Sequence, residues 1–349
     1  MKLPAVLERA TLRAALAVPP SFYRRAFGEP PRNDRGIALD EHMHVLLSLM
    51  EATKHPEIHT LGLEGAREVY DNATKMMDVE AHPTVLRTHM ELNGANGPVY
   101  ARRFSPRSAA DGRPCLVFLH GGGFVVGSVD GYDGVCSQLA ALTGADVVSV
   151  EYALAPEHAF PGGIDDCVAA YRDVLKRCVD WGCDPARVAP IGDSAGANLS
   201  INISQQQVLD GEPVPPWQFL FYPLTDHGVE HASRDLFAHG YYLTKNVMNW
   251  FARTYLGAVL DQDDQHDPRV VPMYFSRMSE MPKTYMVSCG FDPLRDECEQ
   301  YIHVLSDHGI TVIHRDQEHL THGFLTMGGV IPSARYALTS IAAEIRSLL

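Results

Sequence analysis

From about residue 98 to the C-terminus, short apolar runs alternate with longer stretches of helical periodicity. The runs span 115–120, 145–152, 187–192, 217–223, 283–290 and 310–316. Continuous apolar runs of this length fit strands that are buried on both faces. Helical patterns lie between them, for example at 162–182 and 296–309. This alternation predicts an α/β fold with a mostly parallel central sheet that helices flank on both faces.

Two segments lie outside this alternation. Residues 1–85 read as helices separated by proline and glycine, with no clear strand. The second segment, 224–281, contains one helical pattern, at 244–257. Because neither segment supplies a strand, we expect both to fold over one end of the sheet.

Charge and hydropathy exclude several partners. The chain has 349 residues and a formal net charge of −14, so nucleic acid is not an expected partner. No apolar run reaches the ~18 residues that a membrane span needs. Glu8, Arg9 and Arg13 interrupt the helical pattern at 1–18. We therefore expect that pattern to form an amphipathic surface helix, without stable membrane insertion.

The seven cysteines are scattered and include no C-x-x-C pair. This spacing argues against a disulfide framework and against a zinc cluster. We therefore expect reduced thiols in a cytoplasmic protein, and no metal site. The chain has neither a G-x-G-x-x-G pattern nor a lysine at P-loop spacing, so no cofactor is expected.

The pentapeptide GDSAG, from Gly192 to Gly196, stands between an apolar run and a helix-forming segment. In that context G-x-S-x-G predicts a nucleophile elbow, a turn so tight that Ser194 adopts a strained backbone conformation. A side chain at either glycine would strike the adjacent strand or helix. The turn would expose the serine oxygen at a helix N-terminus, where N–H groups face negative charge. The alternative is an ordinary turn whose serine caps the next helix.

A second glycine motif, His120-Gly121-Gly122-Gly123, follows the first apolar run. Glycine lets backbone N–H groups approach a tetrahedral oxyanion closely, because no side chain obstructs them. A flexible turn between strand and helix is the alternative interpretation. A phosphate cradle is disfavoured by the missing lysine.

A serine nucleophile needs an adjacent base that a carboxylate orients. Asp292 and His322 follow the last two apolar runs, so adjacent loops at one sheet edge would carry them. A helix-starting aspartate and a purely structural histidine are the alternatives. His319 is the main rival of His322, whereas His314 lies within a predicted strand and His308 at a predicted helix end.

These residues resemble the hormone-sensitive-lipase-like branch of the α/β-hydrolase esterases. The resemblance covers about residues 98–349 and rests on HGGGFVVGS, EYALAPEHAFPGGIDD, GDSAGANLS, FDPLRDE and HGF. It implies the α/β-hydrolase fold with a helical cap built from the N-terminal segment and a later insert. The expected cap segments are then 1–85 and 224–281, and the catalytic domain comprises 86–223 and 282–349.

Carried over by position, the resemblance implies a nucleophile, a general base and an orienting carboxylate at Ser194, His322 and Asp292. It also implies that an oxyanion hole is formed by the backbone N–H groups of Gly122, Gly123 and Ala195. This chain departs from the family pattern at Ala153, where arginine is usual, and at Gln317 and His319. The departures near His322 concern the substrate pocket and leave the triad in place.

The implied activity is that of a serine carboxylesterase, which hydrolyses short- to medium-chain esters through an acyl-enzyme without a cofactor. The expected partner is a small-molecule ester, and members of the group often form homodimers. An amidase, lactonase or deacetylase would use the same triad. A further alternative is a non-catalytic ligand-binding homologue. Plant gibberellin receptors are of that kind, but they lack the catalytic histidine that this chain retains.

Overall fold

A computed structural model describes residues 11–16, 18–108, 110–227, 229–261 and 267–349. The helix expected over residues 1–18 falls only partly within this range. Residues 11–16 are helical, and residues 1–10 lie outside the described residues. No helix in the described part of the chain is long and apolar enough to cross a membrane.

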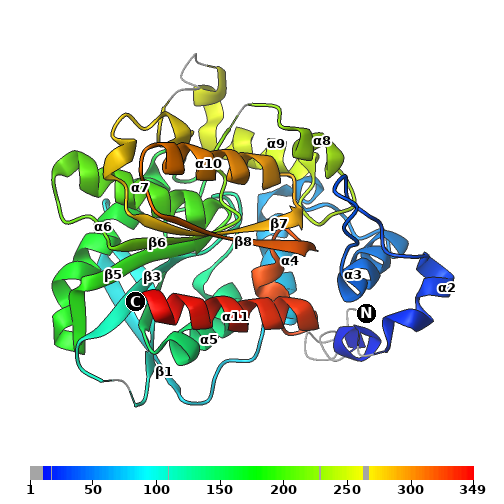
Figure 1. The fold of residues 1–349 in the computed structure, drawn as a ribbon, viewed down its shortest axis with the longest axis horizontal. Helices are drawn as coiled ribbons and strands as arrows, with labels where there is room; N and C mark the ends of the chain where they lie inside the picture. Colours follow the sequence, from blue (N-terminus) through cyan, green and yellow to red (C-terminus); the bar gives the residue numbers. More distant parts are fainter. Residues whose placement is uncertain (1–10, 17, 109, 228, 262–266) are drawn as a thin grey trace.

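An eight-stranded sheet forms the centre of the molecule, in the order β1-β2-β4-β3-β5-β6-β7-β8 (Figure 1). Its strands are β1 (Val85–Asn93), β2 (Pro98–Pro106), β3 (Arg113–Leu119), β4 (Asp146–Val150), β5 (Cys183–Asp193), β6 (Trp217–Phe221), β7 (Lys283–Phe291) and β8 (Val312–Thr321). β2 pairs antiparallel with β1 and β4, and all other pairs are parallel. The six apolar runs therefore form strands, which confirms the predicted mostly parallel sheet.

The strand β1 has no counterpart among the predicted apolar runs. It lies at the edge of the sheet and buries only Val85 and Leu92. Its remaining side chains are exposed or half-buried. Because β1 shows neither a continuous apolar run nor regular alternation, hydrophobic periodicity could not identify it.

Helices cover both faces of the sheet (Figure 1). α5 (Asp133–Thr143) and α11 (Pro332–Leu348) pack together on one face. The other face carries α6 (Gly162–Arg177), α7 (Ala195–Asp210) and α10 (Arg295–Asp307). The helices predicted at 162–182 and 296–309 are therefore confirmed.

The two segments outside the strand–helix alternation are mainly helical. The first contributes α2 (Arg24–Phe27), α3 (Glu41–Ala52) and α4 (Gly62–Met77). The second contributes α8 (Ala232–Leu236) and α9 (Lys245–Leu256), the latter at the predicted position. Residues of α3, α4 and α9 line the same pocket as Ser194, at the carboxyl end of β5. The division of the chain into a cap and a catalytic domain stays a prediction.

A buried carboxylate joins the antiparallel hairpin to the parallel part of the sheet. Asp146 at the start of β4 has no exposed surface. It accepts hydrogen bonds from Arg103 Nε at 2.6 Å, Arg113 Nε at 2.7 Å and Ser105 Oγ at 2.8 Å. One aspartate thereby holds β2, β3 and β4, and its removal would leave two partly buried guanidinium groups without a carboxylate.

We therefore expect Asp146→Ala to lower the free energy of unfolding by about 3–5 kcal/mol. Urea denaturation at neutral pH measures this loss. Glu280→Ala is the matched control, because it breaks the exposed ion pair between Glu280 and Arg277 and should change stability little. Equal stabilities of the two variants would contradict the structural role of Asp146.

Candidate active site

Ser194 occupies the turn between β5 and α7 in a conformation that L-residues rarely adopt, with φ 56° and ψ −119°. The turn brings backbones into close approach. A Cβ atom at Gly192 would lie 2.5 Å from the carbonyl carbon of Gly196. At Gly196 it would lie 1.9 Å from the carbonyl oxygen of Leu119. The expectation that both positions require glycine is confirmed.

His322 lies between Ser194 and Asp292. Its Nε2 is 2.9 Å from Ser194 Oγ, and its Nδ1 is 2.8 Å from Asp292 Oδ2. Asp292 is fully buried after β7, where its Oδ1 also accepts a hydrogen bond from Leu294 N–H at 2.8 Å. A carboxylate facing Nδ1 favours the tautomer with the proton on that atom. Nε2 is then free to accept the proton of Ser194.

The rival histidines do not reach Ser194. The exposed ring of His319 has its Nδ1 2.8 Å from the carbonyl oxygen of Ala38, so it faces the N-terminal segment. His314 lies within β8 and contacts Ser288 Oγ at 2.8 Å. His308, at the end of α10, contacts a carbonyl oxygen of its own helix. Of the four candidates, His322 alone contacts the serine.

The glycine loop after β3 faces the same space. Gly122 and Gly123 have positive φ angles of 122° and 60°. A Cβ atom would lie 2.1 Å from Val126 O at the first and 2.2 Å from the Phe251 ring at the second. The backbone N–H groups of Gly122, Gly123 and Ala195 donate to no protein group among the described residues. They are thus available to bind an oxyanion.

Asp193 is a site residue that sequence reasoning missed. Its buried Oδ1 accepts a hydrogen bond from Gly121 N–H at 2.7 Å, which ties the glycine loop to the elbow. Its Oδ2 accepts from the hydroxyls of Tyr132 at 3.0 Å and Tyr222 at 3.5 Å. Burial raises the pKa of Asp193 to about 6, and the hydrogen bonds oppose that rise. A carboxylate directly before the nucleophile was the available signal.

The stretch 151–166 supports the glycine loop. The Tyr152 hydroxyl donates to His120 O at 2.6 Å, and the two rings stack with centroids 4.4 Å apart. Farther along, Asp166 accepts hydrogen bonds from Ala153 N–H at 3.2 Å and Ala95 N–H at 3.0 Å. The stretch therefore braces the loop that carries Gly122 and Gly123.

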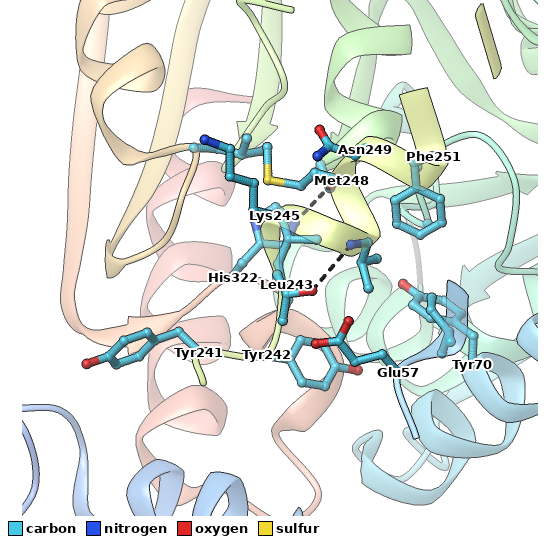
Figure 2. Close-up of a pocket in the computed structure, with 18 of the residues that line it drawn as sticks. Glu57, Tyr70, Tyr241, Tyr242, Leu243, Lys245, Met248, Asn249, Phe251 and His322 are labelled. Carbon is cyan, nitrogen blue, oxygen red and sulfur yellow. Dashed lines mark hydrogen bonds between the residues drawn. The ribbon is translucent and has the colours of Figure 1, made fainter. Parts of the chain in front are cut away.

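A pocket of about 820 Å³ opens onto Ser194 and His322. Aromatic side chains contribute to its wall, including those of Tyr70, Tyr242 and Phe251 (Figure 2). In the part of the chain that the structure describes, no group of three or more His, Cys, Asp or Glu side chains could hold a metal ion. The arrangement presents a hydroxyl, an imidazole and an anion-binding loop to a ligand the size of a small ester.

The raised pKa of Asp193 makes its contribution to stability depend on pH. Its pKa is about 6 in the folded protein against an ordinary 3.8, so between these values the folded state binds more protons. This contribution therefore falls as pH rises from about 4 to about 6. Asparagine keeps an acceptor for Gly121 N–H and carries no charge. We expect Asp193→Asn to lose this pH-dependent change in the free energy of unfolding, which is on the order of 3 kcal/mol.

Urea denaturation of both proteins at acidic and neutral pH measures the difference. The control is Asp180→Asn, which removes an exposed carboxylate near the opposite end of β5 and should leave the pH profile unchanged. If the free energy of unfolding changed with pH in the same way in the wild type and in Asp193→Asn, the raised pKa of Asp193 would be refuted.

Known proteins resemble this chain in both sequence and structure. The family profile described as the alpha/beta hydrolase fold matches residues 116–326. Carboxylic ester hydrolase LipN of Mycobacterium tuberculosis is 36% identical over 268 residues, which cover 74% of this chain and 70% of that protein. Esterase LipI of the same organism is 31% identical, over 87% of this chain and 94% of its own length.

Solved structures of ester hydrolases also resemble the structure of this chain. An ester hydrolase from the Lake Arreo metagenome superposes with a TM-score of 0.85 and is 32% identical, covering 88% of this chain and 98% of that one. A hyperthermophilic esterase from the archaeon Pyrobaculum calidifontis gives a TM-score of 0.77 at 33% identity, over 87% and 97% of the two chains. Sequence and structure therefore point to the same group of proteins.

Proposed function

Since this chain belongs to the hormone-sensitive-lipase-like α/β-hydrolases and is a carboxylic ester hydrolase, we propose that Ser194, His322 and Asp292 form its catalytic triad. His322 Nε2 takes the hydroxyl proton as Ser194 Oγ attacks the ester carbonyl carbon. The oxygen of the tetrahedral intermediate accepts hydrogen bonds from the N–H groups of Gly122, Gly123 and Ala195. His322 then protonates the departing alcohol. Water repeats the cycle on the acyl-enzyme and releases the acid.

One observation carries this proposal: the hydrogen-bonded row from Ser194 Oγ through His322 to Asp292, beside backbone N–H groups that have no hydrogen-bond partner among the described residues. A serine hydroxyl is a weak nucleophile until a base removes its proton. The buried Asp292 orients the ring and stabilises the imidazolium that forms during the reaction. The geometry therefore favours catalysis over simple ligand binding.

The pocket supports a short- to medium-chain ester as the substrate. Its volume of about 820 Å³ lies within the range of small-molecule sites. Because α3, α4 and α9 contribute to its wall, segments 1–85 and 224–281 would set its shape. We infer that these segments act as the cap and the remaining residues as the catalytic domain.

The surroundings of the protein are part of the same proposal. All seven cysteines are buried and none forms a disulfide, which supports a reducing compartment such as the cytoplasm. The homodimer implied by the family resemblance is checked by the mass of the protein in solution.

Removing the nucleophile tests the triad. We expect Ser194→Ala to lower kcat on a p-nitrophenyl ester by on the order of 10⁶. A fluorophosphonate probe should label the wild type and leave the variant unlabelled. Ser306→Ala, at an exposed position on α10, should keep both activity and labelling. More than a few per cent of activity in Ser194→Ala would refute the assignment, and an unlabelled wild type would favour the ligand-binding alternative.

Leaving-group chemistry separates an esterase from an amidase. An ester and an amide with the same acyl group and the same aromatic leaving group differ only in the bond that breaks. We expect the wild type to hydrolyse the ester with the higher kcat/KM, because a phenoxide can leave unprotonated, whereas an aniline leaves only after His322 has protonated its nitrogen. Equal or faster turnover of the amide would favour the amidase alternative.

A further inference from the structure

Glu57, between α3 and the next helical turn, places a carboxylate on the wall of the catalytic pocket (Figure 2). Its Oε2 is buried and accepts no hydrogen bond from the described residues. Among those residues its one ion-pair partner is His59, whose Nδ1 lies 3.0 Å away and is charged only when protonated. The Glu57 side chain is 36% exposed, so water solvates it in part, and its carboxylate has no permanently charged partner among the described residues.

Three of the four lysine and arginine side chains of the pocket wall do not supply that charge, because other carboxylates already engage them. The pairs are Arg234 with Glu297 at 2.5 Å, Arg269 with Asp267 at 2.7 Å, and Lys245 with Glu230 at 3.0 Å and Asp235 at 2.9 Å. The fourth, Lys54, lies exposed on the same wall. Among the described residues, none of these four forms an ion pair with Glu57.

Aromatic side chains line the same pocket as Glu57. Figure 2 shows the Glu57 carboxylate pointing towards Tyr242, and Tyr70 lines the wall as well. Burial, and then the charges of Asp193 and Tyr242, raise the pKa of Tyr70, so the two tyrosines lie within electrostatic reach of each other. The ring of Tyr242 packs beside Gly323, next to His322. Aromatic faces attract cations, and alkylammonium groups above all.

We propose that the esters hydrolysed here carry a positively charged ammonium group, which Glu57 and the rings of Tyr70 and Tyr242 hold. This inference rests on the proposed function, because it names the substrate class of the same site. The cation supplies the partner that Glu57 lacks. Glu57, Tyr242 and Ser194 line the same pocket.

Matched substrates test the inference. One pair is the acetyl ester of a trimethylammonioethyl alcohol and its neutral isostere, in which tert-butyl replaces trimethylammonium. A second pair carries the same two groups on the acyl side of an ethyl ester. We expect the wild-type ratio of kcat/KM, cationic over neutral, to fall roughly 10-fold in Glu57→Gln for at least one pair. That wild-type ratio should also fall with added salt, which screens the attraction.

Because the ratio divides out effects common to both substrates, a general loss of active enzyme does not change it. Glu64→Gln is the control, since it removes one exposed negative charge on α4 outside the pocket wall. Ratios that are the same in the wild type and Glu57→Gln for both pairs would overturn the inference. So would an equal fall in Glu64→Gln. Turnover of the neutral esters would leave the proposed function standing in those cases, whereas a wild type that hydrolyses no ester would refute both.

Discussion

The close approach of Gly196 to the carbonyl oxygen of Leu119 is the constraint on which the rest of the site depends. It brings the first turn of α7 against the end of β3, with no room for a Cβ atom between them. Ser194 and the glycine loop that follows β3 are consequently neighbours. The hydrogen bond from Gly121 N–H to Asp193 then fixes the loop in place. Ser194 and the glycine loop thus share one rigid contact between two parallel strands.

Two carboxylates, those of Asp292 and Asp193, interact with the His322 ring in different ways. Asp292 contacts the His322 ring directly and also binds the backbone at Leu294. Asp193 interacts with His322 only over a longer range. Its oxygens accept hydrogen bonds from Gly121 N–H and from the hydroxyls of two tyrosines. Both carboxylates are buried. Burying such charges costs stability, a common feature of sites that are organised before substrate arrives.

The sequence predicted the parts of this molecule that depend on local pattern. Apolar runs located six of the eight strands, β3 to β8. Residues at the ends of these strands located Ser194, Asp292 and His322, which the structure joins in a hydrogen-bonded row. Choosing His322 over His319 by pattern alone was not possible, because the choice depends on which ring turns toward the pocket. Asp193 and Glu57 were missed for the same reason. The residues that surround Asp193 and Glu57 in the pocket are distant in the sequence, and hydrophobic periodicity does not predict such contacts.

The ring of Phe251 lies so close to Gly123 that it occupies the space of a missing side chain. One residue of the 224–281 insert thereby completes the surface of a loop more than a hundred positions earlier. A variant that lacks a ring at this position would have a hole beside Gly123, and a bulkier side chain would displace the glycine loop. The insert and the loop therefore pack as one unit, in which a change on either side acts on the other.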